Sequence, residues 1–226
     1  MSLPIAVLVS GSGSNLQSII DGIQAGRLDA RIKLVISNKA DAYGLQRAEN
    51  HGMPTRVLAH GEYPSREEYD ADLAGIIKRS GAQAVILAGF MRILSPAFIR
   101  AFENRILNIH PALLPAFPGV NAQKQAHEYG VRISGCSVHF VDEKMDNGPI
   151  IIQAAVPCSP RDDAETLKER ILSFEHRIYP QAVKWLAEDR LRIQGRNVFV
   201  SRAPEPGLYS SGECTALVSP GLEPGF

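Results

Sequence analysis

Long apolar runs and an excess of one charge are both absent from this sequence. It has no stretch of about 18 consecutive apolar residues, which argues against a membrane-spanning helix. The opening MSLPIAVLVSG has no basic segment ahead of its apolar residues, so we expect no signal peptide. The chain balances 24 basic against 24 acidic residues, which argues against a nucleic-acid-binding surface. We therefore expect a cytoplasmic protein that binds neither membranes nor nucleic acid.

Cysteine is also scarce. The three cysteines, Cys136, Cys158 and Cys214, are widely spaced and form no CxxC motif or Cys/His cluster. This pattern argues against a disulfide framework and against a zinc site. We interpret the three as small buried or incidental thiols, and we expect no metal.

The first half of the chain alternates apolar strand patterns with helical ones. The 226 residues, 45% of them hydrophobic, suit one globular domain. Strands are predicted at residues 4–9, 30–37, 54–58 and 82–88, with a helical pattern after each of the first three. Such alternation predicts right-handed βαβ units. The expected fold is therefore α/β, with a doubly wound, mostly parallel, Rossmann-like sheet.

The second half is less regular. Residues 133–141 and 149–156 alternate like strands and are joined by a turn, which predicts antiparallel strands appended to the parallel core. A long helix is predicted from Asp162 or Asp163 to about residue 189, followed by a last strand at 191–200. Residues 203–226 are rich in Pro, Gly and Ser. We expect a single domain over 1–202 and a flexible or surface-draped tail after it.

A glycine-rich turn follows the first predicted strand and precedes the first helix. Its residues are Gly11, Ser12, Gly13, Ser14 and Asn15. Backbone N–H groups at such a helix start can bind a phosphate. Leu16 stands where the dinucleotide fingerprint needs a third glycine, and no acidic residue ends the second strand, so a nicotinamide cofactor is not expected. The alternative is a tight turn without a ligand.

A further strand is predicted at residues 105–109, and an amide and an imidazole lie at its end. Asn108 and His110 point to the same side of that strand, and Pro111 ends it. In an open α/β sheet, ligands bind at the carboxyl ends of strands. His139, within an apolar strand, is interpreted mainly as a satisfied core residue.

Asp146 lies in the turn after His139, where ordinary turn chemistry is the alternative to a functional role. If Asp146 reaches His110, its carboxylate favours the imidazolium and raises the pKa of His110. His110 and the Asn108 amide could then stabilise an oxyanion. These three residue types suit acyl transfer through a tetrahedral intermediate without a nucleophilic Ser or Cys.

Five motifs together carry a resemblance that covers roughly residues 3 to 200. In order they are GSGSN, LAGFMRIL, NIHPALLPAFPG, SVHFVDEKMDNGPII and EHRIYP. This series resembles the phosphoribosylglycinamide formyltransferase family of purine biosynthesis, a branch of the folate-dependent formyltransferase superfamily. The resemblance implies the formyltransferase fold and no metal. It does not extend to the residues after Arg202, because family members usually end near Val200. Leu114-Pro115 is predicted to be a cis peptide from the tight LLP turn.

The resemblance implies an activity as well. The amine of glycinamide ribonucleotide would attack the formyl carbon of the co-substrate 10-formyltetrahydrofolate, in a monomer or homodimer. Asn108 and His110 would stabilise the oxyanion, and Asp146 would tune His110 and assist proton transfer. The remaining expected contacts are to the ribonucleotide (Gly11, Ser12, Gly13, Ser14, Asn15, Arg66 and Glu175) and to the folate (Met91, Arg92, Ile93, Leu94, Val141, Asp142, Glu143, Lys144, Met145 and Asp146).

Some of these residues could have a purely structural role, and the whole chain could have another function. Residues 91–94 could be an ordinary core-packed connection, and Glu175 a solvated helix carboxylate. Within the superfamily, methionyl-tRNA formyltransferase would need a C-terminal RNA-binding domain, and formyltetrahydrofolate hydrolase a domain before the first strand. A non-catalytic nucleotide-binding module would use the glycine turn but would not need Asn108, His110 and Asp146 together.

Overall fold

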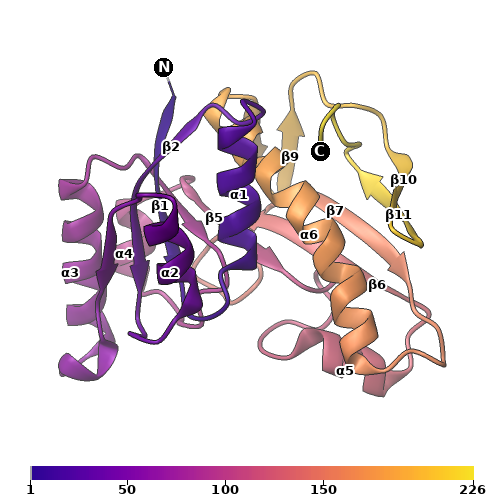
Figure 1. Cartoon of the computed structure of the whole chain (residues 1–226), viewed down its shortest axis with the longest axis horizontal. Coiled ribbons are helices and arrows are strands. Elements are labelled where there is room, and N and C mark those ends of the chain that lie inside the picture. Colours follow the sequence, from indigo (N-terminus) through magenta and orange to yellow (C-terminus); the bar gives the residue numbers. More distant parts are fainter. Residues whose placement is uncertain (1) are drawn as a thin grey trace. The chain divides into compact units, whose positions relative to one another are not determined.

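The computed structural model describes residues 2–226, which form two compact units (Figure 1). The first unit runs to Asn108 and includes Val141–Glu143, and the second comprises Ile109–Phe140 and Lys144–Phe226. The division differs from the single domain that the sequence predicts for residues 1–202. It falls within one strand, β5 (Ile106–His110), so that Asn108 and His110 belong to different units.

The first unit is built on a parallel sheet. Its strands are β1 (Leu3–Val9), β2 (Ala30–Ser37), β3 (Thr55–Val57), β4 (Ala84–Leu87) and the start of β5. They lie in the order β5-β4-β1-β2-β3, and every pair is parallel. The helices are α1 (Ser14–Gln24), α2 (Tyr43–Asn50), α3 (Arg66–Arg79) and α4 (Pro96–Ala101), with a 3-10 turn at His60–Glu62. This confirms the predicted α/β alternation.

Both faces of this sheet are buried, as a doubly wound fold requires. Ala6 and Leu8 of β1 pack in a cluster with Leu73 and Ile77 of α3 and with residues of α4. Successive side chains of a strand point to opposite faces. Val9 therefore lies on the other face, where it is fully buried and close to Gly44 of α2. The near-continuous apolar character of β1 follows from this two-sided burial.

The second unit is built mainly on antiparallel strands. They are β6 (Ile133–Phe140), β7 (Ile150–Pro157), β8 (Leu191–Gln194), β9 (Asn197–Val200), β10 (Gly207–Ser211) and β11 (Cys214–Ser219). Strands β6, β7, β11 and β10 follow one another in antiparallel pairs. The helices are α5 (Ala122–Tyr129) and α6 (Ala164–Ala187), and Asp163 caps α6 through the Thr166 N–H. The predicted antiparallel strands and long helix are confirmed.

Two predictions for the C-terminal region differ from the structure. The single last strand predicted at 191–200 is a hairpin, β8 and β9, because Gly195 adopts a left-handed backbone that reverses the chain. The tail expected after residue 202 contains the β10–β11 hairpin, and β11 pairs with β7. Alternate residues of β11, Ala216 and Val218, are fully buried, so the strand has one apolar face despite the Pro, Gly and Ser around it.

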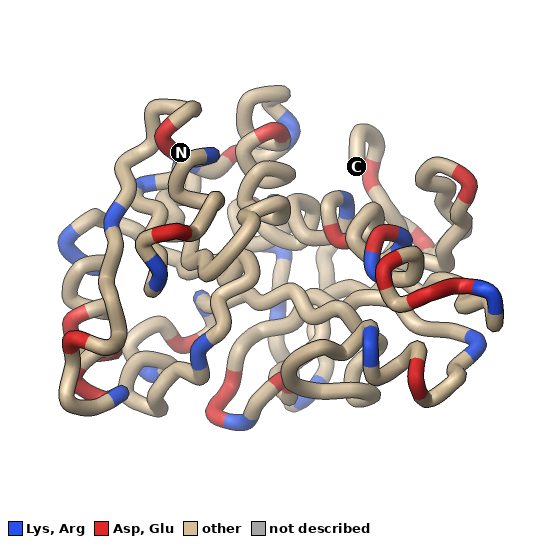
Figure 2. The backbone as a smooth tube through the Cα atoms, turned by 60° about the horizontal axis from the view of Figure 1, so that its bottom comes forward, with Lys and Arg blue, Asp and Glu red and all other residues tan. Residues whose placement is uncertain are grey.

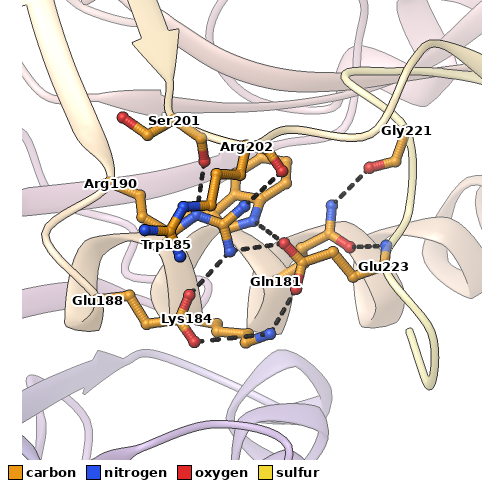
Figure 3. Close-up of polar contacts among 9 residues, drawn as sticks. All are labelled: Gln181, Lys184, Trp185, Glu188, Arg190, Ser201, Arg202, Gly221 and Glu223. Carbon is orange, nitrogen blue, oxygen red and sulfur yellow. Dashed lines mark hydrogen bonds and ion pairs between the residues drawn. The ribbon is translucent and has the colours of Figure 1, made fainter.

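The last residues of the chain are bonded to α6 and to the loop that follows it (Figure 3). The Glu223 carboxylate accepts hydrogen bonds from Lys184, from the Trp185 indole N–H at 2.8 Å and from Arg190 at 2.7 Å. Gln181 donates to the Gly221 carbonyl at 3.0 Å. Since Trp185 is fully buried, its N–H needs an acceptor within the protein, and Glu223 supplies it.

Basic and acidic residues are interspersed along the backbone (Figure 2). Of the helices in residues 2–226, none is both long and apolar enough to cross a bilayer.

We predict that Glu223→Gln lowers the free energy of unfolding by on the order of 1–3 kcal/mol, because it weakens three charge-assisted or buried hydrogen bonds. Urea unfolding followed by the fluorescence of the sole tryptophan measures this. Glu188→Gln is the matched control. Glu188 pairs with the same Arg190 but is about a third exposed, so its loss should cost well under about 1 kcal/mol.

The difference between wild type and Glu223→Gln should also depend on pH. Burial alone would raise the pKa of the Glu223 carboxyl, but bonds from Lys184, Trp185 and Arg190 outweigh burial and lower the pKa below its ordinary 4.5. The stabilisation is therefore present above pH 4.5 and is lost as pH falls through the lower folded value. A difference that stayed constant down to strongly acidic pH would contradict this assignment.

Candidate functional site

The predicted imidazole and carboxylate meet at the end of β5. His110 is buried, and its Nδ1 lies 3.4 Å from Asp146 Oδ2. Its Nε2 lies 2.8 Å from the Phe117 carbonyl oxygen. Both ring nitrogens thus face an oxygen that can accept a hydrogen bond. Asn108 is on the same strand, two residues earlier, opposite Leu87 of β4.

Asp146 is the centre of a larger polar cluster. Its Oδ2 also accepts a hydrogen bond from the Gly119 N–H at 2.7 Å, and its Oδ1 lies 3.8 Å from Nε2 of His139. The Asp146 side chain is only 12% exposed, and its backbone is left-handed with φ 49°. A carboxylate this buried requires such donors. The turn therefore reverses the chain and also places a buried carboxylate beside His110 and His139.

His139 also contacts Asp146, and sequence reasoning did not predict this contact. It is buried, as its interpretation as a core residue expects, and its Nδ1 lies 2.8 Å from the Phe140 carbonyl. Its other nitrogen faces Asp146. The available signal was position, because His139 is next to last in β6, directly before the segment that carries Asp146.

The loop after β5 is held in place by β6 and β7. Ser137 of β6 donates to the Ala112 carbonyl at 2.7 Å and accepts from the Leu114 N–H at 3.1 Å. Gln153 of β7 donates to the Leu114 carbonyl at 3.1 Å. Leu114-Pro115 is a cis peptide, which confirms the prediction from the LLP turn. These bonds position the Phe117 carbonyl and the Gly119 N–H beside His110 and Asp146.

The glycine turn forms the start of α1. Gly13 is the N-cap residue, with φ 68°, and as a glycine it has no side chain that could cap the helix. A Cβ on Gly13 would lie 2.5 Å from the Gly44 Cα, so the close approach of α2 requires glycine at this position. Gly11 and Ser12 are exposed. The predicted phosphate-binding turn thus has exposed backbone at a helix N-terminus, where an anion is favoured.

Arg47 of α2 is a second residue that sequence reasoning missed. Its Nε donates to the Ser12 carbonyl at 2.8 Å, so a guanidinium lies against the glycine turn. Arg66, expected to contact phosphate, is at the first position of α3 and forms an ion pair with the neighbouring Glu67 at 3.1 Å. The structure does not bring Arg66 to the turn through any hydrogen bond or ion pair among the described residues.

The interpretation of Glu175 as a solvated carboxylate is wrong. Glu175 lies on α6 and is only 5% exposed. Its charge acts on the neighbouring β6 residue Cys136, whose pKa is raised well above its ordinary value first by complete burial and then by Glu175. Glu175 is therefore a buried carboxylate on α6, and its contact with the ribonucleotide stays a prediction.

The residues expected to contact folate lie in two segments. In the first, after β4, Met91 and Ile93 expose 68% and 58% of their surface, whereas Leu94 is buried. The Arg92 guanidinium lies 4.5 Å from the centre of the Tyr69 ring. Leu94 is thus packed in the core as the alternative expects, Met91 and Ile93 are not, and the contact with folate stays a prediction.

The second segment, residues 141–146, is the acidic turn. Val141 donates its N–H to the Ile106 carbonyl at 3.0 Å, and Glu143 pairs with Arg100 at 2.8 Å. Met145 is more than half exposed. Asp142 and Lys144 complete the stretch, half-buried and exposed respectively. Within residues 2–226, no group of three or more His, Cys, Asp or Glu side chains is arranged to hold a metal ion.

Comparison with known proteins gives a family match over most of the chain. The sequence profile described as "Formyl transferase" matches residues 3–183. The phosphoribosylglycinamide formyltransferase of Escherichia coli K12 is 44% identical over 211 residues, covering 92% of this chain and 99% of that protein. An alignment that covers 92% of the chain must extend past residue 202. This corrects the expectation that the likeness stops near Val200.

Larger proteins match as well. The trifunctional purine biosynthetic protein adenosine-3 of Drosophila pseudoobscura is 53% identical over 190 residues, and the chain spans only 14% of that protein. Among solved structures, glycinamide ribonucleotide transformylase 1 of Symbiobacterium toebii is 52% identical with a TM-score of 0.87, covering 88% of this chain and 94% of that one. The phosphoribosylglycinamide formyltransferase of Coxiella burnetii, solved with CHES, is 44% identical with a TM-score of 0.84 over 88% of this chain and 94% of that one.

We predict that Gly13→Ala destabilises the first unit by about 1–3 kcal/mol, because it combines a left-handed backbone with a clash against backbone atoms of Gly44. Gly11→Ala is the matched control in the same turn. A Cβ at Gly11 meets no atom within 4 Å, so its effect should stay within about 0.5 kcal/mol. Urea unfolding of both variants tests this, and equal destabilisation would contradict the role given to Gly13.

Proposed function

Because the chain belongs to the formyl transferase family, we propose that it transfers the formyl group of 10-formyltetrahydrofolate to the amine of glycinamide ribonucleotide in purine biosynthesis. The observation that carries the proposal is the pairing of His110 with Asp146 at the end of the strand that bears Asn108. The names of the E. coli and S. toebii relatives support the choice of substrate and reaction. We infer a cytoplasmic reaction from composition.

The first chemical step is attack of the neutral amine on the formyl carbon. This produces a tetrahedral intermediate whose oxygen carries negative charge. The Asn108 amide and the His110 imidazolium are the donors that would stabilise this oxygen. In the structure His110 Nε2 faces the Phe117 carbonyl, so an oxyanion beside Nε2 competes with that carbonyl for the same hydrogen. The loop holding Phe117 must therefore yield the hydrogen bond, or share it, when the intermediate forms.

The second step moves a proton and releases tetrahydrofolate. The attacking nitrogen becomes positively charged and must lose a proton before the C–N bond to the folate breaks. Asp146, which lies 3.4 Å from His110, would act as the base, with a water molecule carrying the proton to it. Loss of the folate nitrogen as a leaving group requires that it receive a proton in turn. No covalent enzyme intermediate is needed.

Two sets of residues would bind the substrates. For the ribonucleotide, the backbone of residues 11–15 would bind the phosphate, Arg47 would add positive charge beside it, and Glu175 would hold the amino and ribose end. Arg66 would join the phosphate contacts only by leaving its ion pair with Glu67. The folate would lie against residues 91–94 and 141–146, where Met91, Ile93 and Met145 are exposed.

A direct assay tests the proposal. We would follow the absorbance of released folate product after mixing the protein with 10-formyltetrahydrofolate, with and without glycinamide ribonucleotide. Release that requires the ribonucleotide is the expected result. Release without it would indicate a formyltetrahydrofolate hydrolase. No release in either case, from folded protein that still binds the ribonucleotide, would indicate a non-catalytic nucleotide-binding module.

We predict that Asn108→Ala and Asp146→Asn each lower kcat by about 10²–10⁴-fold, because each removes a group that acts on the developing charge or the proton. The Kd for glycinamide ribonucleotide, measured by calorimetry, should change by less than about threefold. Glu165→Gln, which changes an exposed carboxylate paired with Lys168, is the control and should turn over normally. Normal turnover by Asn108→Ala or Asp146→Asn would make the catalytic assignment wrong.

We predict that Glu175→Gln raises KM for the ribonucleotide by at least about tenfold and lowers kcat less, because a neutral amide no longer pairs with the substrate's polar end. The KM for 10-formyltetrahydrofolate should stay nearly unchanged. Steady-state kinetics with each substrate varied separately gives both values, and the tryptophan fluorescence of the folded variant checks that α6 is intact. An equal effect on both KM values would contradict a role confined to the ribonucleotide.

A further inference from the structure

Two cysteines that the proposed activity does not use lie at or next to the ends of two neighbouring strands, β7 and β11. Strand β11 pairs with β7 in antiparallel register, with Leu217 opposite Ala155 and Val218 opposite Ala154. The observed pairing ends at Leu217 and Ala155, and the same register extended by three residues would set Cys214 opposite Cys158. Cys214 is the first residue of β11, and Cys158 directly follows the last residue of β7.

The two cysteines also share one face of these strands. Ala154 and Val156 of β7 are buried, and so are Ala216 and Val218 of β11. Because side chains alternate along a strand, Cys158 and Cys214 belong to this same set. Directly opposite residues of an antiparallel pair have Cα atoms about 4.5 or 5.5 Å apart. Both separations fall in the range of roughly 4.4–6.8 Å that a disulfide bridges.

A single ion pair borders both thiols, which independently places them together. Asp162 and Arg170 form a bidentate salt bridge, with the shorter contact at 2.5 Å. Burial raises the pKa of both cysteines, and in each case the charge of Arg170 partly opposes this rise. The charge of Cys214 raises the pKa of Cys158 further. Both thiols are free and only half-buried.

A cavity gives one of the thiols access to small molecules. It has a volume of about 270 Å³ and is lined by Cys158 together with His127, Arg132 and Asp162, among others. The cavity is large enough for part of a small organic molecule, and Arg132 and His127 offer donors to a carboxylate. Cys158 is therefore the thiol that a reagent bound in this cavity meets.

We propose that Cys158 and Cys214 form a reversible disulfide when the protein meets a low-molecular-weight organic disulfide. The Cys158 thiolate attacks one sulfur of the reagent, and the S–S bond of the reagent breaks to release one thiolate. The Cys214 thiolate then attacks Cys158 Sγ in the mixed disulfide, and the second thiolate of the reagent leaves. The two protons of the protein thiols end on the two released thiols. The protein is oxidised by two electrons and the reagent is reduced by two.

The test uses the full chain and oxidised glutathione in a mildly alkaline buffer. After reaction, the remaining free thiols are blocked with a maleimide under denaturing conditions, and the protein is analysed by mass spectrometry. The expected product has lost two hydrogen atoms, keeps one free thiol and gives a proteolytic peptide that links Cys158 to Cys214. Cys136 should be the free thiol, because it is fully buried. Its midpoint of thermal unfolding should rise by roughly 5–10 °C over the reduced protein.

Single variants separate this reaction from ordinary thiol modification. Cys158→Ser should block the reaction with glutathione at Cys214 as well, or slow it at least about tenfold. Cys214→Ser should stop at the mixed disulfide on Cys158. Cys136→Ser, the matched control, should oxidise as the wild type does. If this variant does not fold, the peptide map of the wild type still decides. A wild-type product with glutathione retained on both cysteines, an intermolecular dimer, or unreacted thiols would each overturn the proposal.

Discussion

One buried carboxylate organises the candidate site. Asp146 is 12% exposed, and its two oxygens face His110, His139 and the Gly119 N–H. A charge removed from water to this extent is tolerated only when several donors surround it. The donors come from three separate segments: the end of β5, the end of β6 and the loop between β5 and α5. Burying Asp146 therefore requires all three segments to converge, and the site is a consequence of this requirement.

The loop between β5 and α5 satisfies the requirement through its backbone. Its contribution is one N–H, of Gly119, and one carbonyl, of Phe117, each aimed at a member of the His110 and Asp146 pair. Phe117 has φ 50°, which a residue with a side chain adopts only when its surroundings demand it. Here Ser137 and Gln153 hold the earlier part of the loop to the sheet. Freeing His110 Nε2 for a substrate would require this loop to move. The position of the loop would therefore decide whether that nitrogen can donate a hydrogen bond to the substrate.

The sequence predicts this site where local chemistry decides the structure. The strand end before Pro111, the cis bond in the LLP turn and the glycine turn each depend on the conformational limits of a few neighbouring residues. The contact between Asp146 and His110 is long-range, and the sequence alone does not decide whether it forms. The contact of His139 with Asp146 was missed because an apolar strand context indicates a core residue and does not show what lies across from its ring.

The C-terminal region shows the opposite error, in which composition conceals a pattern. Residues 203–226 are rich in Pro, Gly and Ser, but they contain alternate buried positions, Ala216 and Val218, and the acidic Glu223. The buried positions become ordered by pairing of β11 with the edge of β7. Glu223 becomes ordered by its hydrogen bond with Trp185 of α6. Pairing with an existing strand stabilises a short hairpin that would not be stable alone. Long-range partners, which the sequence does not name, therefore decide whether such a segment is ordered.

The position of α6 connects this C-terminal region to the candidate site. The helix carries buried Glu175 near its middle, and Gln181, Lys184 and Trp185 toward its end are bonded to residues 221–223. Near its start, Arg170 holds Asp162 beside Cys158, next to the strand that β11 extends. The last residues of the chain thus contact α6 on the C-terminal side of Glu175, whereas Asp162 contacts it on the N-terminal side. Both sets of contacts hold the helix that carries Glu175, so they help to fix the position of its carboxylate.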